Sequence, residues 1–491
     1  MNIRFKGASL QHYERILNTA VSQEDTAETI VPDALPDVAE LLMTDGQSLI
    51  RGKDVHHSGV SVSGISELSV LYRTEEGSLG RLPVEIPFET EISFNIPDDS
   101  AKIVASVRLT GCEARILNSR KLLLRAETCI TVSVWSQRTL RWAEEAAAEG
   151  CRVERKTECC VLRPVSEIVE KTFTAEDSQP MPAGRPRAES LLSTRASLRW
   201  EEAEQVGRKL VVRGTADVTA LYRTLDDEAA TAEFRLPWSA FLELPETDKG
   251  LSWELVTALT GCSGELTEEN GFSIAVGGVV QAVIRNETEI SWIADAYGID
   301  CAFAPVFETT EMDTATSCES KTENLNIFLN SMRKPRSLVY LTADCGRPRQ
   351  DKENLRLPVN VKALCVMEDG RPEQLSGRGE MSFAGIGSLP EVSCGEVFAS
   401  VTPGGVELRV PVCIRQTRCS RRTLSLLTDA EVSERSERYQ GPNVVLLRAS
   451  DGDSVWSLGK KKGISCTAIR SYNQLEEGEE PAPGSLLLLA R

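Results

Sequence analysis

Apolar and polar residues alternate over much of this chain. In the segment VSVSGISELSVLYRT, which begins at Val60, apolar residues recur at Val62 and Leu68, and LLLRAETCITVSVW further along has a similar pattern. Side chains of a strand point to opposite faces in turn, so a period of two indicates strands with one buried face. Turn-forming residues such as Glu75 and Gly77 separate the runs. The pattern predicts a mainly antiparallel β protein.

Two places break the alternation. After two prolines, residues 36–43 predict a short helix, because proline suits the first helical turn. Near the C-terminus, GDSVWSLGKKKGISCTAIRSYN lies between apolar runs at 444–449 and 485–490, which predicts a strand, two helices and a strand. Ser454 and Ser465 are suitable N-caps, and Gly463 can end the first helix in the left-handed conformation. The predicted core of this segment is Val455, Leu458, Ile464, Ile469, Leu475, Leu486 and Leu488.

A long internal repeat organises the rest of the chain. Residues 32–112 recur 150 positions later without a gap. The matches are Pro32 and Pro36 with Pro182 and Pro186, Gly64 with Gly214, Leu-Tyr-Arg-Thr at 71–74 and 221–224, IPF ending at Phe88 with LPW ending at Trp238, and Leu-Thr-Gly-Cys at 109–112 and 259–262. Solenoid repeats have periods of about 20–50 residues, so this repeat is a copied domain.

A third copy is more divergent. VNVKALCVMEDG at 359–370 aligns with ADVTALYRTLDD at 216–227. We therefore predict a mainly β multidomain chain with two to three tandem antiparallel β-rich domains. The predicted boundaries are 1–165 and 166–303 for the first two copies, 304–432 for the divergent copy, 433–442 for a linker and 443–491 for the terminal βααβ module.

Composition and charge narrow the function. The chain has 491 residues, 41% of them hydrophobic, and a net charge of −18. The hydrophobic fraction suffices for packed cores. The negative charge argues against binding to nucleic acid or to an anionic membrane surface. The N-terminal residues show no apolar run typical of a signal peptide, and we find no stretch long enough to span a membrane. The expectation is a soluble, non-secreted protein.

Candidate catalytic and metal-binding residues are few. The 14 cysteines include no C-x-x-C pair and mostly occupy apolar runs, so we expect reduced thiols in the cores. His56 and His57 are adjacent and would point to opposite faces of a strand, which is unsuitable for one metal ion. No paired carboxylates or nucleophile arrangement supports an enzyme. We therefore predict no catalytic residue, no metal site and no cofactor.

The first copy resembles the SPOCS domain of spore-associated proteins from endospore-forming bacteria. The resemblance rests on Pro32-Asp33, Pro36-Asp37-Val38, Gly64, Leu71-Tyr72 and Ile86-Pro87-Phe88. The second copy keeps the prolines but has Ala183 and Arg187 in place of the two aspartates. Any interaction that needs these acids would therefore belong to the first copy.

The terminal module resembles LysM. The matching residues are Gly452-Asp453-Ser454-Val455-Trp456-Ser457-Leu458-Gly459, Gly463, Asn473, Pro483-Gly484 and the apolar strand 486–489. Gly459 departs from the alanine usual in the family. The resemblance implies a βααβ fold whose loops at 452–455 and 473–475 form a shallow groove, one that commonly holds N-acetylglucosamine polymers. The candidate ligand- or partner-binding residues are Gly452, Asp453, Ser454, Val455, Trp456, Asn473, Gln474 and Leu475.

Repeated SPOCS domains followed by LysM are similar to the spore-coat morphogenetic proteins that partner a sporulation ATPase at the forespore surface. The resemblance implies a non-enzymatic interaction protein of the mother-cell cytoplasm, with that ATPase and other coat proteins as partners. The alternative is a protein that binds peptidoglycan or another N-acetylglucosamine polymer of the spore or cell wall. For Trp456 both a packing role and a contact role remain open. The acid runs, such as 476–480, are either solvated faces or a docking surface for a basic partner.

Overall fold

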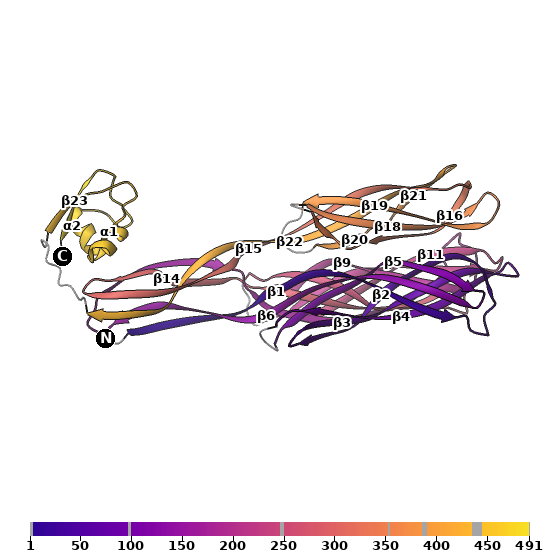
Figure 1. Cartoon of the computed structure of the whole chain (residues 1–491), viewed down its shortest axis with the longest axis horizontal. Coiled ribbons are helices and arrows are strands. Elements are labelled where there is room, and N and C mark those ends of the chain that lie inside the picture. The colour runs from indigo at the N-terminus through magenta and orange to yellow at the C-terminus, as the bar shows by residue number, and fades with distance from the viewer. Residues whose placement is uncertain are drawn as a thin grey trace.

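The computed structural model describes residues 3–96, 100–245, 250–351, 354–384, 390–434 and 444–490. Strands dominate and pair in antiparallel fashion, which confirms the mainly antiparallel β prediction. Figure 1 shows an elongated molecule, with β sandwiches at one end and long ribbons that run to the other. The N-terminal strand and the terminal module both lie at the ribbon end. None of the described helices is long and apolar enough to cross a membrane.

Unit one, residues 3–148, is a sandwich of two sheets. One sheet has the order β2-β3-β4, and the other contains β1, β6 and β5. The strands are β1 (Ile3–Ile30), β2 (Val38–His56), β3 (Gly59–Thr74), β4 (Leu79–Ser93), β5 (Lys102–Asn118) and β6 (Lys121–Ala148). Val70, Leu82 and Leu122 are among the residues buried between the sheets. The alternating sequence pattern therefore marks the inward faces of both sheets.

Unit two, residues 153–298, repeats this layout. Its strands are β7 (Val153–Leu162), β8 (Val165–Gln179), β9 (Ala188–Val206), β10 (Lys209–Thr224), β11 (Ala229–Glu243), β12 (Ser252–Leu266), β13 (Phe272–Arg285) and β14 (Thr288–Gly298). The bounds of β9, β10 and β11 lie 150 residues after those of β2, β3 and β4. A pairing of Tyr13 with Val165 joins the second sheets of both units into one sheet of six strands.

Unit three, residues 301–434, has the same two sheets with a shorter edge. Its strands are β15 (Cys301–Asn330), β16 (Pro335–Cys345), β17 (Arg349–Asp351), β18 (Asn354–Met367), β19 (Pro372–Ala384), β20 (Glu391–Cys394), β21 (Phe398–Thr402) and β22 (Gly405–Glu434). Strands β16, β18 and β19 form one sheet, and β15 pairs with β22 in the other. Where units one and two have the long edge strands β5 and β12, the short strands β20 and β21 pair with β22.

The first and last strands of each unit extend beyond its sandwich as a ribbon. The ribbons are β1 with β6, β7 with β14, and β15 with β22. Trp142, Trp292 and Leu424 pack between them. The chain passes from one ribbon to the next at residues 149–152 and 299–300, whereas the predicted boundaries lie at the start of β8 and within β15. Of the predicted linker, Ser433 and Glu434 end β22, and residues 435–442 lie outside the described residues.

The helix predicted at residues 36–43 is wrong. Val38 begins β2, and the chain pairs with β3 from Val38 to His56. Leu42 and Met43 are buried in a cluster with Leu192 and Tyr340 from the other units. Eight residues are too few for a helix to be stable by itself, so pairing with β3 and burial between units determine the conformation.

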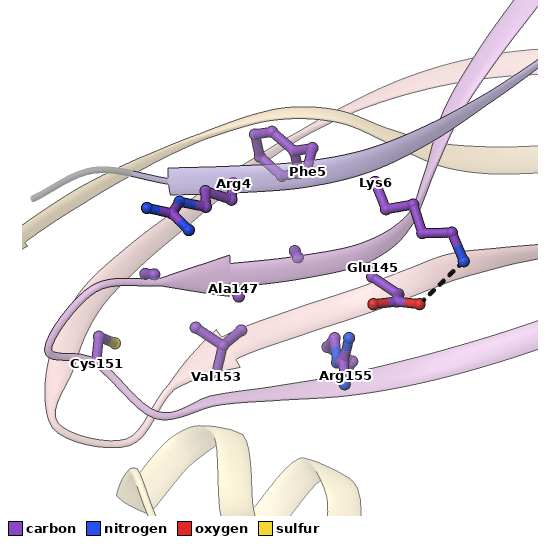
Figure 2. Close-up of a pocket in the computed structure, with 10 residues that line it drawn as sticks. Arg4, Phe5, Lys6, Glu145, Ala147, Cys151, Val153 and Arg155 are labelled. Carbon is purple, nitrogen blue, oxygen red and sulfur yellow. Dashed lines mark hydrogen bonds and ion pairs between the residues drawn. The ribbon is translucent and has the colours of Figure 1, made fainter.

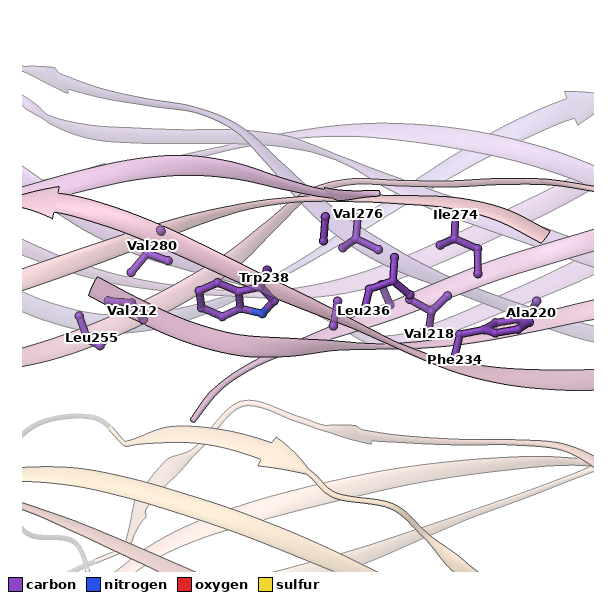
Figure 3. Close-up of a cluster of buried hydrophobic side chains, with 14 of the residues drawn as sticks. Val212, Val218, Ala220, Phe234, Leu236, Trp238, Leu255, Ile274, Val276 and Val280 are labelled. Carbon is purple, nitrogen blue, oxygen red and sulfur yellow. The ribbon is translucent and has the colours of Figure 1, made fainter. Parts of the chain in front are cut away.

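The repeated glycine and the repeated aromatic residue are explained by one close contact. Gly64 pairs with Phe88 and Gly214 pairs with Trp238 across neighbouring strands. A Cβ atom on Gly214 would lie 2.5 Å from the Trp238 ring. Trp238 also stacks on Phe173 with ring centroids 4.3 Å apart, within the buried cluster of Figure 3. The glycine is therefore required wherever the aromatic ring covers the strand.

A disulfide at the ribbon end corrects the prediction that the cysteines are all reduced. Cys151 bonds to Cys301, and the other 12 cysteines are free. The partners are 150 residues apart in sequence, a separation that no short spacing motif reveals. They meet because the turns between the ribbons come together at the same end of the molecule. Burial raises the pKa of the Cys112 thiol to about 11, so this free thiol is unreactive at neutral pH.

We expect the disulfide to be visible by thiol titration. Protein purified without reductant and then denatured should show 12 thiols, and reduced protein should show 14, the number in the sequence. Cys151→Ser should lower the stability by about 2–4 kcal/mol, because the bond closes a long loop. Cys159→Ser, which replaces an exposed free cysteine, is the control. A count of 14 thiols without reductant would contradict the assignment.

Candidate functional site

The terminal module has the predicted order of elements. It consists of β23 (Val444–Arg448), α1 (Val455–Lys462), α2 (Cys466–Asn473) and β24 (Leu486–Ala490). Ser454 caps α1 by accepting a hydrogen bond from the Ser457 backbone N–H, and Ser465 caps α2 in the same way through Ala468. Gly463 ends α1 at a φ of 63°, in the left-handed region. The predicted caps and stop are confirmed, so the local sequence determines both helices.

The predicted core is partly wrong at the last strand. Val455, Leu458, Ile464 and Ile469 are buried as expected, and Leu475 packs against them. In β24, however, Leu487 and Leu489 point inward, whereas Leu486 has 59% of its surface exposed. Four consecutive leucines carry no period of two, so only pairing with β23 determines which face is buried.

The first predicted groove loop is held by its own polar groups. Gly452 is exposed, and the Asp453 carboxylate accepts a hydrogen bond of 2.8 Å from the Ser450 backbone N–H. Ser454 is the helix cap, and the Val455 side chain is buried. The Val455 backbone N–H donates to the Glu480 carboxylate at 2.6 Å. An acidic side chain from beyond the second loop therefore closes the start of α1, where an N–H group would otherwise be open to a ligand.

The second predicted groove loop is tied to the sheet. The Asn473 side chain donates to the carbonyl oxygens of Ile469 and Leu488 and accepts from the Leu488 N–H at 2.6 Å. Gln474 follows α2 at a φ of 53° and is exposed, and Leu475 is half-buried. Asn473 thus joins α2 to β24, and Gln474 is the more accessible of the two polar residues.

Trp456 lies apart from both loops and contacts the ribbon end. Its indole Nε1–H donates to the Asp295 carboxylate of β14 at 2.8 Å, and its ring meets Tyr297 edge-on with centroids 5.0 Å apart. Lys460 pairs with the other oxygen of Asp295 at 2.6 Å. We call these four residues, Asp295, Tyr297, Trp456 and Lys460, the docking contact. In this structure Trp456 has a packing role between the module and unit two.

Tyr297 also explains the unusual glycine of the module. The Tyr297 hydroxyl donates to the carbonyl of Ile464 at 2.8 Å, and burial raises its pKa well above the usual range. A Cβ atom on Gly459 would lie 2.4 Å from this hydroxyl and 2.8 Å from the Ile464 carbonyl. The departure from alanine was thus the sequence signal of a close contact. Nothing in the sequence near Asp295 and Tyr297 identified β14 as the surface that the module contacts.

The acids of the first copy are engaged within unit one. Asp33 and Asp37 form ion pairs of 2.9 and 2.8 Å with Arg120. In unit two the position equivalent to Arg120 is Asn270, whose side chain accepts from the Ala188 backbone N–H. Unit two therefore lacks both the acids and the cation that pairs with them. In unit one, Asp33 and Asp37 hold the segment before β2 against Arg120.

A shallow pocket lies at the ribbon end near the module. Its volume is about 450 Å³, and it is lined by residues of β1, β6 and β7, including Arg4, Lys6, Glu145 and Arg155. Figure 2 shows these side chains with the helices of the module below them. Arg4 pairs with Glu149 and Lys6 with Glu145, but all four side chains are mostly exposed. Solvent screens such pairs, so they form no preorganised binding site.

Within the described ranges, no group of three or more His, Cys, Asp or Glu side chains is arranged to hold a metal ion. His56 and His57 are both exposed at the turn between β2 and β3. The residues with the clearest arrangement for recognition are therefore those of the module and its neighbouring acids. Comparisons of the chain with protein-family models, with curated proteins and with solved structures found no match.

Proposed function

We propose that this chain is a non-enzymatic interaction protein of endospore coat assembly. In this proposal the LysM-like module, together with the SPOCS-like repeats, docks to a sporulation morphogenetic ATPase at the forespore surface. The proposal rests on the SPOCS and LysM resemblances and on the chemistry of the predicted groove. The observation that favours a protein over a sugar is the hydrogen bond between Val455 and Glu480.

That contact makes the groove acidic. Glu480 occupies the N–H at the start of α1, and Glu476, Glu477 and Glu479 are exposed beside it. A neutral sugar gains nothing from this charge, whereas a basic protein surface is attracted to it and oriented by it. We call Glu476, Glu477, Glu479 and Glu480 the acidic rim. Because Trp456 faces the ribbon, the acidic rim is the part of the module best suited to a partner.

The packing of three similar units against one another supports a scaffold role. Units one and two share a six-stranded sheet, and all three units contribute to a central buried cluster that includes Leu42, Leu192 and Leu364. Their outer faces therefore offer several docking surfaces on one molecule. The cysteines no longer support a reducing compartment, since Cys151 and Cys301 are bonded. The mother-cell location is carried by the resemblance alone.

The test is a charge reversal on the acidic rim. In the full chain, Glu477→Lys is expected to weaken binding to the purified ATPase about tenfold, because a rim charge is reversed against a basic surface. Binding would be measured by calorimetry at low and high salt, and the difference between variants should shrink at high salt. Glu268→Lys, at the turn between β12 and β13, makes the same change of net charge elsewhere and is the control.

The same titration with N-acetylglucosamine oligomers decides between the two partners. Binding to the oligomers alone, insensitive to salt, would replace the proposed function with glycan binding. Equal losses in Glu477→Lys and Glu268→Lys would contradict the assignment of the acidic rim as the contact surface.

A further inference from the structure

The outer face of unit three carries two exposed aromatic side chains where the matching faces of its sister units carry polar residues. Phe328 on β15 has 44% of its surface exposed, and Phe398 on β21 has 61% exposed. At the same cross-strand positions, unit one has Glu28 and Glu113, and unit two has Ser178 and Ser263. All four of these polar side chains are exposed. The fold therefore accommodates polar residues at these positions, and the phenylalanines are particular to unit three.

The two rings flank a pair of opposite charges. Phe328 pairs with Glu407, and Phe398 pairs with Arg409, on opposite sides of β22. Residues two apart on a strand share a face, so Glu407 and Arg409 point outward between the rings. Both side chains are exposed. We call Phe328, Phe398, Glu407 and Arg409 the unit-three patch.

The arrangement is self-complementary. A twofold axis that lies across β22 at the level of Leu408 places Glu407 of one copy opposite Arg409 of the other, and the reverse. The same operation brings each Phe328 beside its counterpart and each Phe398 beside its counterpart. Twofold contacts use the same patch on both subunits, and this patch supplies both the apolar contact and the matched charges. Contact between the aromatic rings would also remove apolar surface from water, which favours association.

We propose that the unit-three patch binds a second copy of this chain, face to face, to form a twofold dimer. The second copy is favoured over an unrelated partner because one acid and one base stand side by side, so that the patch matches itself in charge. The contact is distant in the fold from the acidic rim of the module. The dimer and the partner contact of the module can therefore be tested separately.

The experiment measures the oligomeric state of the full chain by sedimentation velocity between about 1 and 100 µM, where moderate dimers dissociate. Wild-type protein should shift from monomer to dimer. Phe328→Glu with Phe398→Glu, which installs the residues of unit one, should raise the dimer dissociation constant at least 100-fold. Phe241→Glu is the control, because Phe241 is 52% exposed on β11 and unit one has Glu91 at that position.

A charge exchange tests the twofold geometry itself. Glu407→Arg and Arg409→Glu should each weaken the dimer at least tenfold, since like charges then face each other, and the double exchange should restore it. A wild-type chain that stays monomeric over the full range would overturn the proposal. So would a dimer that the double phenylalanine variant leaves intact, or single and double charge variants that behave alike. None of these outcomes affects the titrations of the module with the ATPase.

Discussion

Arg195→Met is expected to lower the free energy of unfolding by about 3 kcal/mol, because it leaves two largely buried carboxylates without their cation. Arg195 of β9 donates to Asp45 of β2 at 2.8 Å and pairs with Asp344 of β16. The side chains of Asp45 and Asp344 are only 8% and 17% exposed. Tyr340 also donates to Asp45, at 2.5 Å. Polar side chains from all three units thus meet at the centre of the molecule, two of them, Tyr340 and Asp344, from unit three.

Urea denaturation would measure the loss, with Arg199→Met as the matched control. Arg199 lies on the same strand but is about half exposed, and its ion pairs with Glu201 and Asp217 are 3.6 and 3.5 Å long. Solvent screens those pairs, so the control should lose less than about 1 kcal/mol. Equal losses in the two variants would show that the central ion pairs add nothing to cohesion between units.

The stability lost in Arg195→Met should also depend on pH. Burial already raises the pKa of Asp344, and removal of the cation raises it further. A carboxyl group whose pKa is higher in the folded state binds more protons there than when unfolded. Stability therefore rises as pH falls through the raised folded pKa toward the unfolded value near 4. The loss of unfolding free energy relative to wild type should be largest at pH 8 and smaller at pH 5. Urea denaturation midpoints at both pH values would measure it.

Asp295→Ala is expected to release the module from the ribbon end. This carboxylate accepts from the Trp456 indole and pairs with Lys460, so its loss removes two polar links between the module and the ribbon. The Tyr297 contacts alone should then hold the module weakly. The indole N–H of Trp456, followed by NMR and assigned with Trp456→Phe, should exchange with solvent at least tenfold faster than in wild type.

Asp300→Ala is the control for release of the module. Asp300 lies at the same end of the molecule and forms an exposed ion pair of 2.6 Å with Arg152. It should leave the exchange of the Trp456 indole N–H unchanged. Tyr297→Phe keeps the ring but removes the hydroxyl bond to Ile464, so its effect should be intermediate. Unaltered exchange in Asp295→Ala would mean that Trp456 is protected within the module itself.

Features that depend on neighbouring residues were predictable. The alternation in residues 60–74 predicted the strand observed as β3, and the serines before α1 and α2 predicted their caps. The helix predicted at 36–43 was wrong because Leu42 and Met43 are buried against other units, and that contact leaves no local period. The run of leucines in β24 failed for the same reason, since pairing chooses the inward face.

The candidate site divides in the same way. The resemblance placed seven of the eight candidate residues in two loops, and the structure ties these loops to Ser450, Glu480 and Leu488. Trp456 was ambiguous because its neighbours, Asp295 and Tyr297, are about 160 residues away in sequence. Only the glycine at position 459, where the family usually has alanine, indicated a close contact, and it did not identify the contacting residue.

The sequence by itself determined the β class, the 150-residue repeat and the two capped helices. These depend on side-chain alternation, on residues matched at one offset and on hydrogen bonds within a single turn, all of which are local. Only the tertiary structure decided the three ribbons, the Cys151–Cys301 bond, the charges around Arg195 and the direction of Trp456. Each of these joins residues far apart in the sequence, and what brings them together is the burial of apolar faces between units, which no short segment encodes.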